Sequence, residues 1–136
     1  MRNRRVLVAD ADGNVRSAAH ALLDRYTVTV ETVHDGAEAL CMVRATHDTP
    51  YDVIIADIRL PDMNGYELMV KLQDLVKPVP LVLMTGFGYD PGHSIVNARK
   101  AGLPAWAILY KPFRLDQLLS AVERILQEPE QQVPQK

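Results

Sequence analysis

The sequence has little that points to an extracellular or membrane protein. It contains a single cysteine, Cys41, which cannot form an intramolecular disulfide and is typical of a reducing compartment. It also lacks any apolar run long enough for a signal peptide or a membrane span. We therefore expect a cytoplasmic protein that does not associate with membranes.

An excess of charge of one sign is absent as well. The formal net charge is −2 at pH 7, too close to balance for the basic footprint of a nucleic-acid-binding domain. The four histidines are scattered without the spacing of metal ligands, so no structural metal site is expected. With 48% hydrophobic residues over 136 positions, the composition is that of one ordinary globular domain.

Short apolar runs predict the strands. Four of them are continuously apolar and rich in Val, Ile and Leu, as in strands covered by helices on both faces. They lie at residues 6–9, 53–56, 81–84 and 105–110. A fifth run, at residues 27–33, alternates with polar residues and suits an edge strand.

Stretches with helical periodicity separate these runs, the clearest being residues 114–126. The others lie at residues 16–25, 37–44, 66–75 and 91–101. Strand followed by helix, repeated five times, predicts a doubly wound α/β fold with a mainly parallel sheet and helices on both faces. We expect a single domain over residues 1–127 and a polar tail over residues 128–136, either disordered or a truncated linker.

Polar residues directly follow four of the predicted strands, namely Asp10, Asp57, Thr85 and Lys111. In such sheets ligands bind beyond the carboxyl ends of the strands, so we expect these side chains to share one pocket. Carboxylates bind a hard divalent cation, whereas a lysine and a hydroxyl bind phosphoryl oxygens. Each residue alone is weak evidence, because an aspartate at a strand end is commonly a helix N-cap. Together they predict a site for a cation and a phosphoryl group.

Several motifs resemble those of receiver domains of response regulators. The stretch from Tyr51 to Leu68 is similar to the family's phosphoacceptor loop, with Asp57 followed by Pro61 and Gly65 at the family's spacing. Further similarity is carried by Val6-Leu7-Val8-Ala9-Asp10, Met84-Thr85-Gly86 and Tyr110-Lys111-Pro112-Phe113. The resemblance covers residues 5 to about 126 and implies a flavodoxin-like sheet of five strands in the order 2-1-3-4-5.

The resemblance implies a signalling domain of a two-component phosphorelay rather than an enzyme; it would catalyse only its own phosphotransfer and dephosphorylation. Asp57 would take a phosphoryl group from a histidine kinase or phosphotransfer protein. Lys111 would pair with the phosphoryl oxygens. Mg²⁺ would be held by Asp10, Asp57 and the Arg59 backbone carbonyl, with Asp12 as an additional candidate ligand.

The same resemblance assigns the switch and the partners. Thr85 would move toward the phosphoryl group and rearrange the surface of the fourth helix, fifth strand and fifth helix. That surface is also the candidate homodimer face, and the downstream target is not named by the sequence. Gly86 would leave the phosphoryl group accessible, while Arg59 and Phe87 would tune how fast water removes it.

Two positions depart from the family's pattern. Ala11 stands where the family has a second acidic residue that contacts the metal, so Mg²⁺ binding is expected to be weakened. Ile108 stands where the family has an aromatic switch residue. Tyr110 and Trp106 lie nearby, and we favour simple core packing for Trp106. The segment 103–109 is also about two residues longer than the family's pattern.

Two other functions stay open on the sequence alone. Ala11 and Ile108 favour a receiver-like interaction module that works without phosphorylation. More remotely, Asp10-Ala11-Asp12 resembles the first motif of haloacid-dehalogenase-type phosphohydrolases, with Asp10 as nucleophile and Asp12 as general acid. That family expects an acidic pair after its lysine, whereas only Asp116 follows here, and the phosphoacceptor-like loop stays unexplained.

Overall fold

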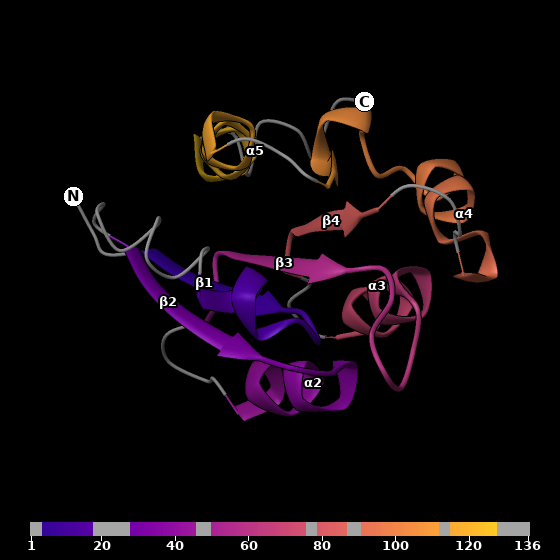
Figure 1. Ribbon diagram of the computed structural model, residues 1–136, viewed down its shortest axis with the longest axis horizontal. Helices are drawn as coiled ribbons and strands as arrows, with labels where there is room; N and C mark the ends of the chain where they lie inside the picture. Colours follow the sequence, from indigo (N-terminus) through magenta and orange to yellow (C-terminus); the bar gives the residue numbers. More distant parts are fainter. Residues whose placement is uncertain are drawn as a thin grey trace.

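The computed structural model describes residues 4–17, 28–45, 50–75, 79–86, 91–111 and 115–127. Within this part of the chain, five parallel strands form one sheet in the order β2-β1-β3-β4-β5, of which Figure 1 labels β1 to β4. The strands are β1 (Arg4–Ala9), β2 (Val28–Val33), β3 (Val53–Asp57), β4 (Leu81–Thr85) and β5 (Ile108–Tyr110). The order predicted from the sequence is confirmed.

Burial follows the sequence pattern of each strand. All residues of β3 and β4 are buried, because helices cover both faces of the sheet there. In β2 the side chains of Val30 and Val33 are buried while Thr29 and Thr32 are exposed, as expected for an edge strand. The predicted fifth strand is too long at its start. Ala105–Ala107 form a 3₁₀ turn, in which the Ala107 N–H donates to the Pro104 carbonyl at 3.0 Å.

The helices cover the two faces of the sheet unequally. One apolar cluster joins the sheet to α2 (Gly36–Ala45), α3 (Gly65–Gln73) and α4 (Ser94–Lys100). The other joins it to α5 (Leu115–Gln127). Figure 1 shows α5 on one side of the sheet, with α2 and α3 together on the opposite side. The first helix is predicted over residues 16–25, but helical structure already begins at residue 13 and continues to 17. The rest of that predicted helix and the tail lie outside the described residues.

The start of α4 differs from the prediction. The sequence predicts a helix from Pro91, but only a 3₁₀ turn, Pro91–His93, forms there and α4 begins at Ser94. Gly92 and His93 have φ angles of 65° and 53°, in the left-handed region that a right-handed helix cannot contain. The predicted first turn is therefore interrupted by backbone conformation.

Gly65, which begins α3, leaves no room for a side chain. A Cβ there would lie 2.9 Å from Ile58 Cγ2 and 3.0 Å from the Ile58 Cα. We expect Gly65→Ala to lower the free energy of unfolding by about 2 kcal/mol, because the backbone of Ile58 must shift. Urea denaturation measures this change, with Gly86→Ala as the control because nothing lies within 4 Å of its added Cβ. Equal losses in the two variants would contradict the steric explanation.

Candidate functional site

The strand register brings the four predicted site residues to one edge of the sheet. Ala9 pairs with Ala56, so Asp10 and Asp57 follow at the ends of neighbouring strands. Thr85 pairs with Tyr110, and the Lys111 N–H donates to the Thr85 carbonyl at 2.6 Å. Asp10, Asp57 and Thr85 are buried, with relative exposures of 2%, 8% and 2%. Buried polar groups of this kind require partners.

Lys111 is the common partner of the two carboxylates. Its Nζ lies 2.9 Å from Asp10 Oδ2 and 2.5 Å from Asp57 Oδ2. Burial by itself lowers the pKa of Lys111, but the hydrogen bonds to Asp57 and Asp10 outweigh it and hold that pKa above its ordinary value. Burial raises the pKa of Asp10 above its usual range, although the Asp12 N–H and Lys111 act in the opposite direction.

Backbone donors fix the remaining carboxylate oxygens. The Asp12 N–H donates to Asp10 Oδ1 at 2.8 Å, and the Arg59 N–H donates to Asp57 Oδ1 at 2.8 Å. Each carboxylate oxygen retains a further acceptor site, because it has two lone pairs. The two carboxylates are therefore oriented toward the same point and can accept a further ligand there.

Asp12 does not join this pair. Its side chain is exposed, and its Oδ1 accepts a hydrogen bond from the Asn14 N–H at 2.9 Å. Its carbonyl accepts from the Arg16 N–H, so Asp12 starts the helical segment that follows. Over the part of the chain that the structure describes, no three His, Cys, Asp or Glu side chains gather as a metal-binding group. The Asp12 carboxylate thus does not substitute for the acidic side chain that is missing at position 11.

Arg16 is a neighbour of the site that the sequence pattern does not single out. Its Nη1 donates to the Asp10 carbonyl at 2.6 Å. This contact holds the backbone of the residue whose carboxylate meets Lys111. A basic residue six positions after a strand-end aspartate is the only sequence signal for it, and it is too common a pattern to be predictive.

The other predicted site residues have distinct surroundings. The Thr85 hydroxyl donates to the Gly86 carbonyl at 3.1 Å rather than to either carboxylate. Gly86 has open space where a Cβ would be. Ile108 is buried, whereas Tyr110 is 55% exposed. Phe87, Pro112 and Phe113 lie outside the described residues, so the predicted role of Phe87 stays a prediction.

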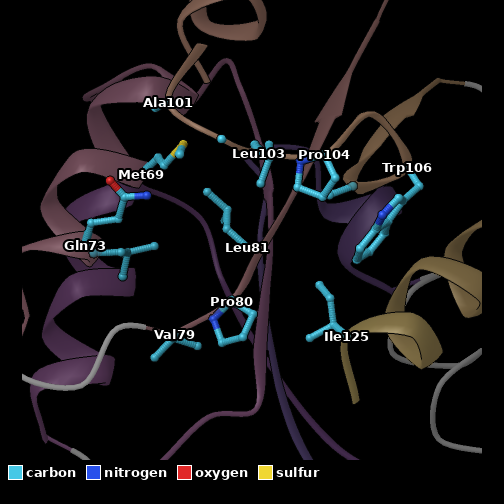
Figure 2. Close-up of a pocket in the computed structure, with 13 residues that line it drawn as sticks. Met69, Gln73, Val79, Pro80, Leu81, Ala101, Leu103, Pro104, Trp106 and Ile125 are labelled. Atoms are coloured by element: carbon cyan, nitrogen blue, oxygen red, sulfur yellow. The ribbon is translucent and has the colours of Figure 1, made fainter. Parts of the chain in front are cut away.

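Trp106 packs between the two apolar clusters, as predicted. Its ring also lies under the Arg124 guanidinium, 4.5 Å from the centroid. It borders a pocket of about 320 Å³, which Figure 2 shows, at the end of β4 opposite the carboxylates. Its lining is mainly apolar and includes Met69, Leu72, Val79, Leu81, Leu103 and Ile125. This pocket is separate from the carboxylate–lysine site and lacks its chemistry.

The fold and the site define a class of protein. A five-stranded doubly wound sheet, with two carboxylates, a hydroxyl and a lysine at the carboxyl ends of its strands, is the arrangement of a two-component receiver. The response regulator receiver domain family matches residues 6–123. The chain belongs to this family and is a signalling rather than a catalytic domain. The match includes both Asp57 and Lys111. It therefore explains the loop after Asp57, which the phosphohydrolase alternative does not.

Individual relatives agree with this assignment. The response regulator MprA of Mycobacterium ulcerans is 35% identical over 124 residues, covering 90% of this chain and 50% of that protein. The chain thus spans about half the length of the curated relatives that it matches. A CheY-like receiver domain protein from Methanospirillum hungatei has a TM-score of 0.80 at 26% identity, covering 95% of this chain and 98% of the other. CheY4 of Vibrio cholerae has a TM-score of 0.73 at 26% identity, covering 90% and 98%.

No helix among the described residues is both long and apolar enough to cross a membrane.

Proposed function

We propose that Asp57 accepts a phosphoryl group from a phosphohistidine of a histidine kinase or phosphotransfer protein. The observation that carries this proposal is the contact of Lys111 Nζ with the carboxylates of both Asp57 and Asp10. An Asp57 carboxylate oxygen forms the new bond to phosphorus as the phosphorus–nitrogen bond of the donor breaks. The electron pair of that bond returns to the imidazole nitrogen, so the exchange needs no further reactant.

Lys111 is placed to stabilise the product. Phosphorylation replaces the single negative charge of Asp57 with a phosphoryl group that carries more charge and three acceptor oxygens. Because Nζ already lies within hydrogen-bond distance of Asp57, it can donate to a phosphoryl oxygen after a small movement. The Thr85 hydroxyl, which now donates to a backbone carbonyl, can exchange that bond for one to a phosphoryl oxygen.

The residues present fit Mg²⁺. Mg²⁺ keeps several waters and is commonly bound by one or two carboxylates together with phosphate oxygens. Asp10 and Asp57 supply two carboxylates that already meet at one cation, the Lys111 ammonium. With the Arg59 backbone carbonyl they would hold the ion even without an acidic residue at position 11. When bound, the ion neutralises charge on the phosphoryl oxygens.

Phosphorylation would be read at the surface of α4, β5 and α5, where we place a downstream target or a second copy of the chain. Gly86 leaves open space beside Thr85, which suits access of water to the phosphoryl group. Arg59 is exposed two residues after Asp57 and, with Phe87, is proposed to tune the hydrolysis rate. The location is proposed to be the cytoplasm, and nucleic-acid binding is not assigned to this domain.

Two observations favour a second function, a receiver-like module that works without phosphorylation. Lys111 already forms ion pairs with both carboxylates, and Ile108 provides no polar aromatic group to respond to a change at Thr85. In this alternative the ion pairs are structural, and the same surface binds its partner constitutively.

Intact mass after incubation with acetyl phosphate and Mg²⁺ decides between these functions. We expect the wild type to gain the mass of one phosphoryl group and Asp57→Asn to gain none, because the amide is not nucleophilic. The adduct should disappear when the ion is chelated before the incubation. Absence of an adduct, together with failure to bind beryllofluoride, would favour the phosphorylation-independent module.

A further inference from the structure

Asn64, the residue directly before α3, lies against Gly92 in the segment before α4. Asn64 is the N-cap of α3, where its Oδ1 accepts from the Glu67 N–H at 2.8 Å. Glu67 completes a capping box by accepting from the Asn64 N–H at 2.8 Å. The capping role uses the oxygen of the Asn64 side chain. Its amide nitrogen points elsewhere, toward Gly92.

The contact between Asn64 and Gly92 is closer than any other residue at position 92 permits. A Cβ on Gly92 would lie 2.3 Å from Asn64 Nδ2, and its φ of +65° is in the region that side chains rarely adopt. The Gly92 carbonyl accepts from Asn97 Nδ2 at 3.1 Å, which ties Gly92 to α4. Because Asn64 packs tightly against Gly92 and Gly92 is bonded to Asn97, a movement of the Asn64 side chain displaces the start of α4.

A second contact lies beside the first. Ser94, the first residue of α4, is fully buried, and its hydroxyl accepts from the Tyr66 N–H at 3.3 Å. The first turn of α3 and the start of α4 are thus joined at two points. The α4 helix is only seven residues long and follows two left-handed residues, so these contacts lie at the point where the helix begins.

The other end of this set of contacts is the phosphoacceptor. The Arg59 N–H donates to Asp57 Oδ1, and Arg59 forms an antiparallel bridge with Asn64. The Gly65 N–H donates to the Ile58 carbonyl at 3.0 Å, which closes the loop between β3 and α3. The Arg59 hydrogen bond and the Arg59–Asn64 bridge thus connect the Asp57 carboxylate to Asn64. If the Asp57 oxygen that accepts from the Arg59 N–H is modified or moves, the loop that contains Arg59 and Asn64 must therefore adjust.

We propose that the contact between Asn64 and Gly92 transmits the phosphorylation state of Asp57 to the first turn of α4. The inference rests on the proposed function, since it assumes that Asp57 is modified. Attachment of a phosphoryl group changes the acceptor of the Arg59 N–H, the loop adjusts, and the Asn64 amide moves against Gly92. This route does not need an aromatic residue at position 108, where this chain has a buried isoleucine.

Asn64→Ser is the variant that separates coupling from capping. Serine keeps an oxygen that caps α3 but is too short to reach Gly92. Glu67→Gln is the matched control, because glutamine preserves the capping box and does not touch Gly92. In the wild type we expect beryllofluoride with Mg²⁺ to change hydrogen exchange in residues 94–100 by about tenfold. Glu67→Gln should show the same change, whereas Asn64→Ser should show less than a third of it with an unaltered phosphoryl adduct.

A double-mutant cycle in the unmodified protein tests the contact without any phosphoryl group. Gly92→Ala should accelerate exchange of the Tyr66 and Glu67 amides, because its Cβ displaces Asn64. In the Asn64→Ser/Gly92→Ala double variant the effects should be clearly less than multiplicative, since serine leaves room for the Cβ. Multiplicative effects, or an unchanged α4 response in Asn64→Ser, would overturn the inference. Absence of an adduct on the wild type would instead overturn the proposed function, and the mass measurement identifies that case.

Discussion

Lys111→Met is expected to lower the free energy of unfolding by about 2 kcal/mol at pH 7, and to abolish or strongly reduce phosphorylation of Asp57. Methionine keeps much of the length of the side chain but removes the charge that two buried carboxylates share. Removing one partner of a buried ion pair leaves the other uncompensated, which costs about 3–5 kcal/mol when burial is complete. The Lys111 side chain is 25% exposed, so a smaller loss is expected.

The loss should depend on pH in a definite direction. In the wild type the folded-state pKa of Lys111 is raised, so its stabilisation is fully present below the unfolded pKa of about 10.5 and is lost as the pH rises through the folded value. In the variant the uncompensated Asp10, whose pKa burial already raises, regains stability on protonation. The difference between the two proteins should therefore be largest near neutral pH and smaller in acid and in strong alkali.

Urea denaturation at pH 5, 7 and 11 measures this difference, together with intact mass after treatment with acetyl phosphate at pH 7. Lys71→Met is the control, because Lys71 is exposed on α3 and should cost little at any pH. Equal and pH-independent losses in both variants would show that the Lys111 ion pairs do not stabilise the site.

Ala11→Asp should tighten Mg²⁺ binding about tenfold. Ala11 is exposed directly after Asp10, so an aspartate there can direct its carboxylate to the cation without displacing the core. A unit charge at about 4 Å from a divalent ion contributes roughly 2 kcal/mol even in water, and side-chain ordering reduces that gain. Without Mg²⁺ the added like charge should lower the free energy of unfolding by about 0.5 kcal/mol.

Calorimetric titration with Mg²⁺ gives the affinities, and the rise of the unfolding midpoint with Mg²⁺ gives an independent check. Ala11→Asn is the matched control, because it adds nearly the same volume and polarity without the charge. Similar affinities in the aspartate and asparagine variants would show that position 11 does not face the cation.

Several elements could be predicted from local pattern alone. The continuous apolar runs of β1, β3 and β4 are readable because both faces of these strands are covered, and the alternation of β2 reflects its place at the edge. The convergence of Asp10, Asp57, Thr85 and Lys111 was also predictable, because parallel strands end at the same edge of the sheet.

Other features were not predictable from local pattern. The apolar run at 105–110 contains both a 3₁₀ turn and β5, and periodicity does not distinguish a strand from a short turn in so few residues. The late start of α4 depends on Gly92 fitting against Asn64, which is 28 positions earlier in the chain. Asp12 has a carboxylate that could bind a metal ion, yet its Oδ1 accepts a hydrogen bond from the Asn14 N–H.

Sequence pattern alone specifies the class of fold, the edge of the sheet that carries the site and the residue types available there. Each of these depends on periodicity and on the order of elements along the chain. Three features depend on the packed domain: Lys111 bridges two carboxylates, the Thr85 hydroxyl donates to a backbone carbonyl, and the segments before α3 and α4 meet at Asn64 and Gly92. These are contacts of a few ångströms between residues remote in sequence, and their geometry is set by the packing of the whole domain.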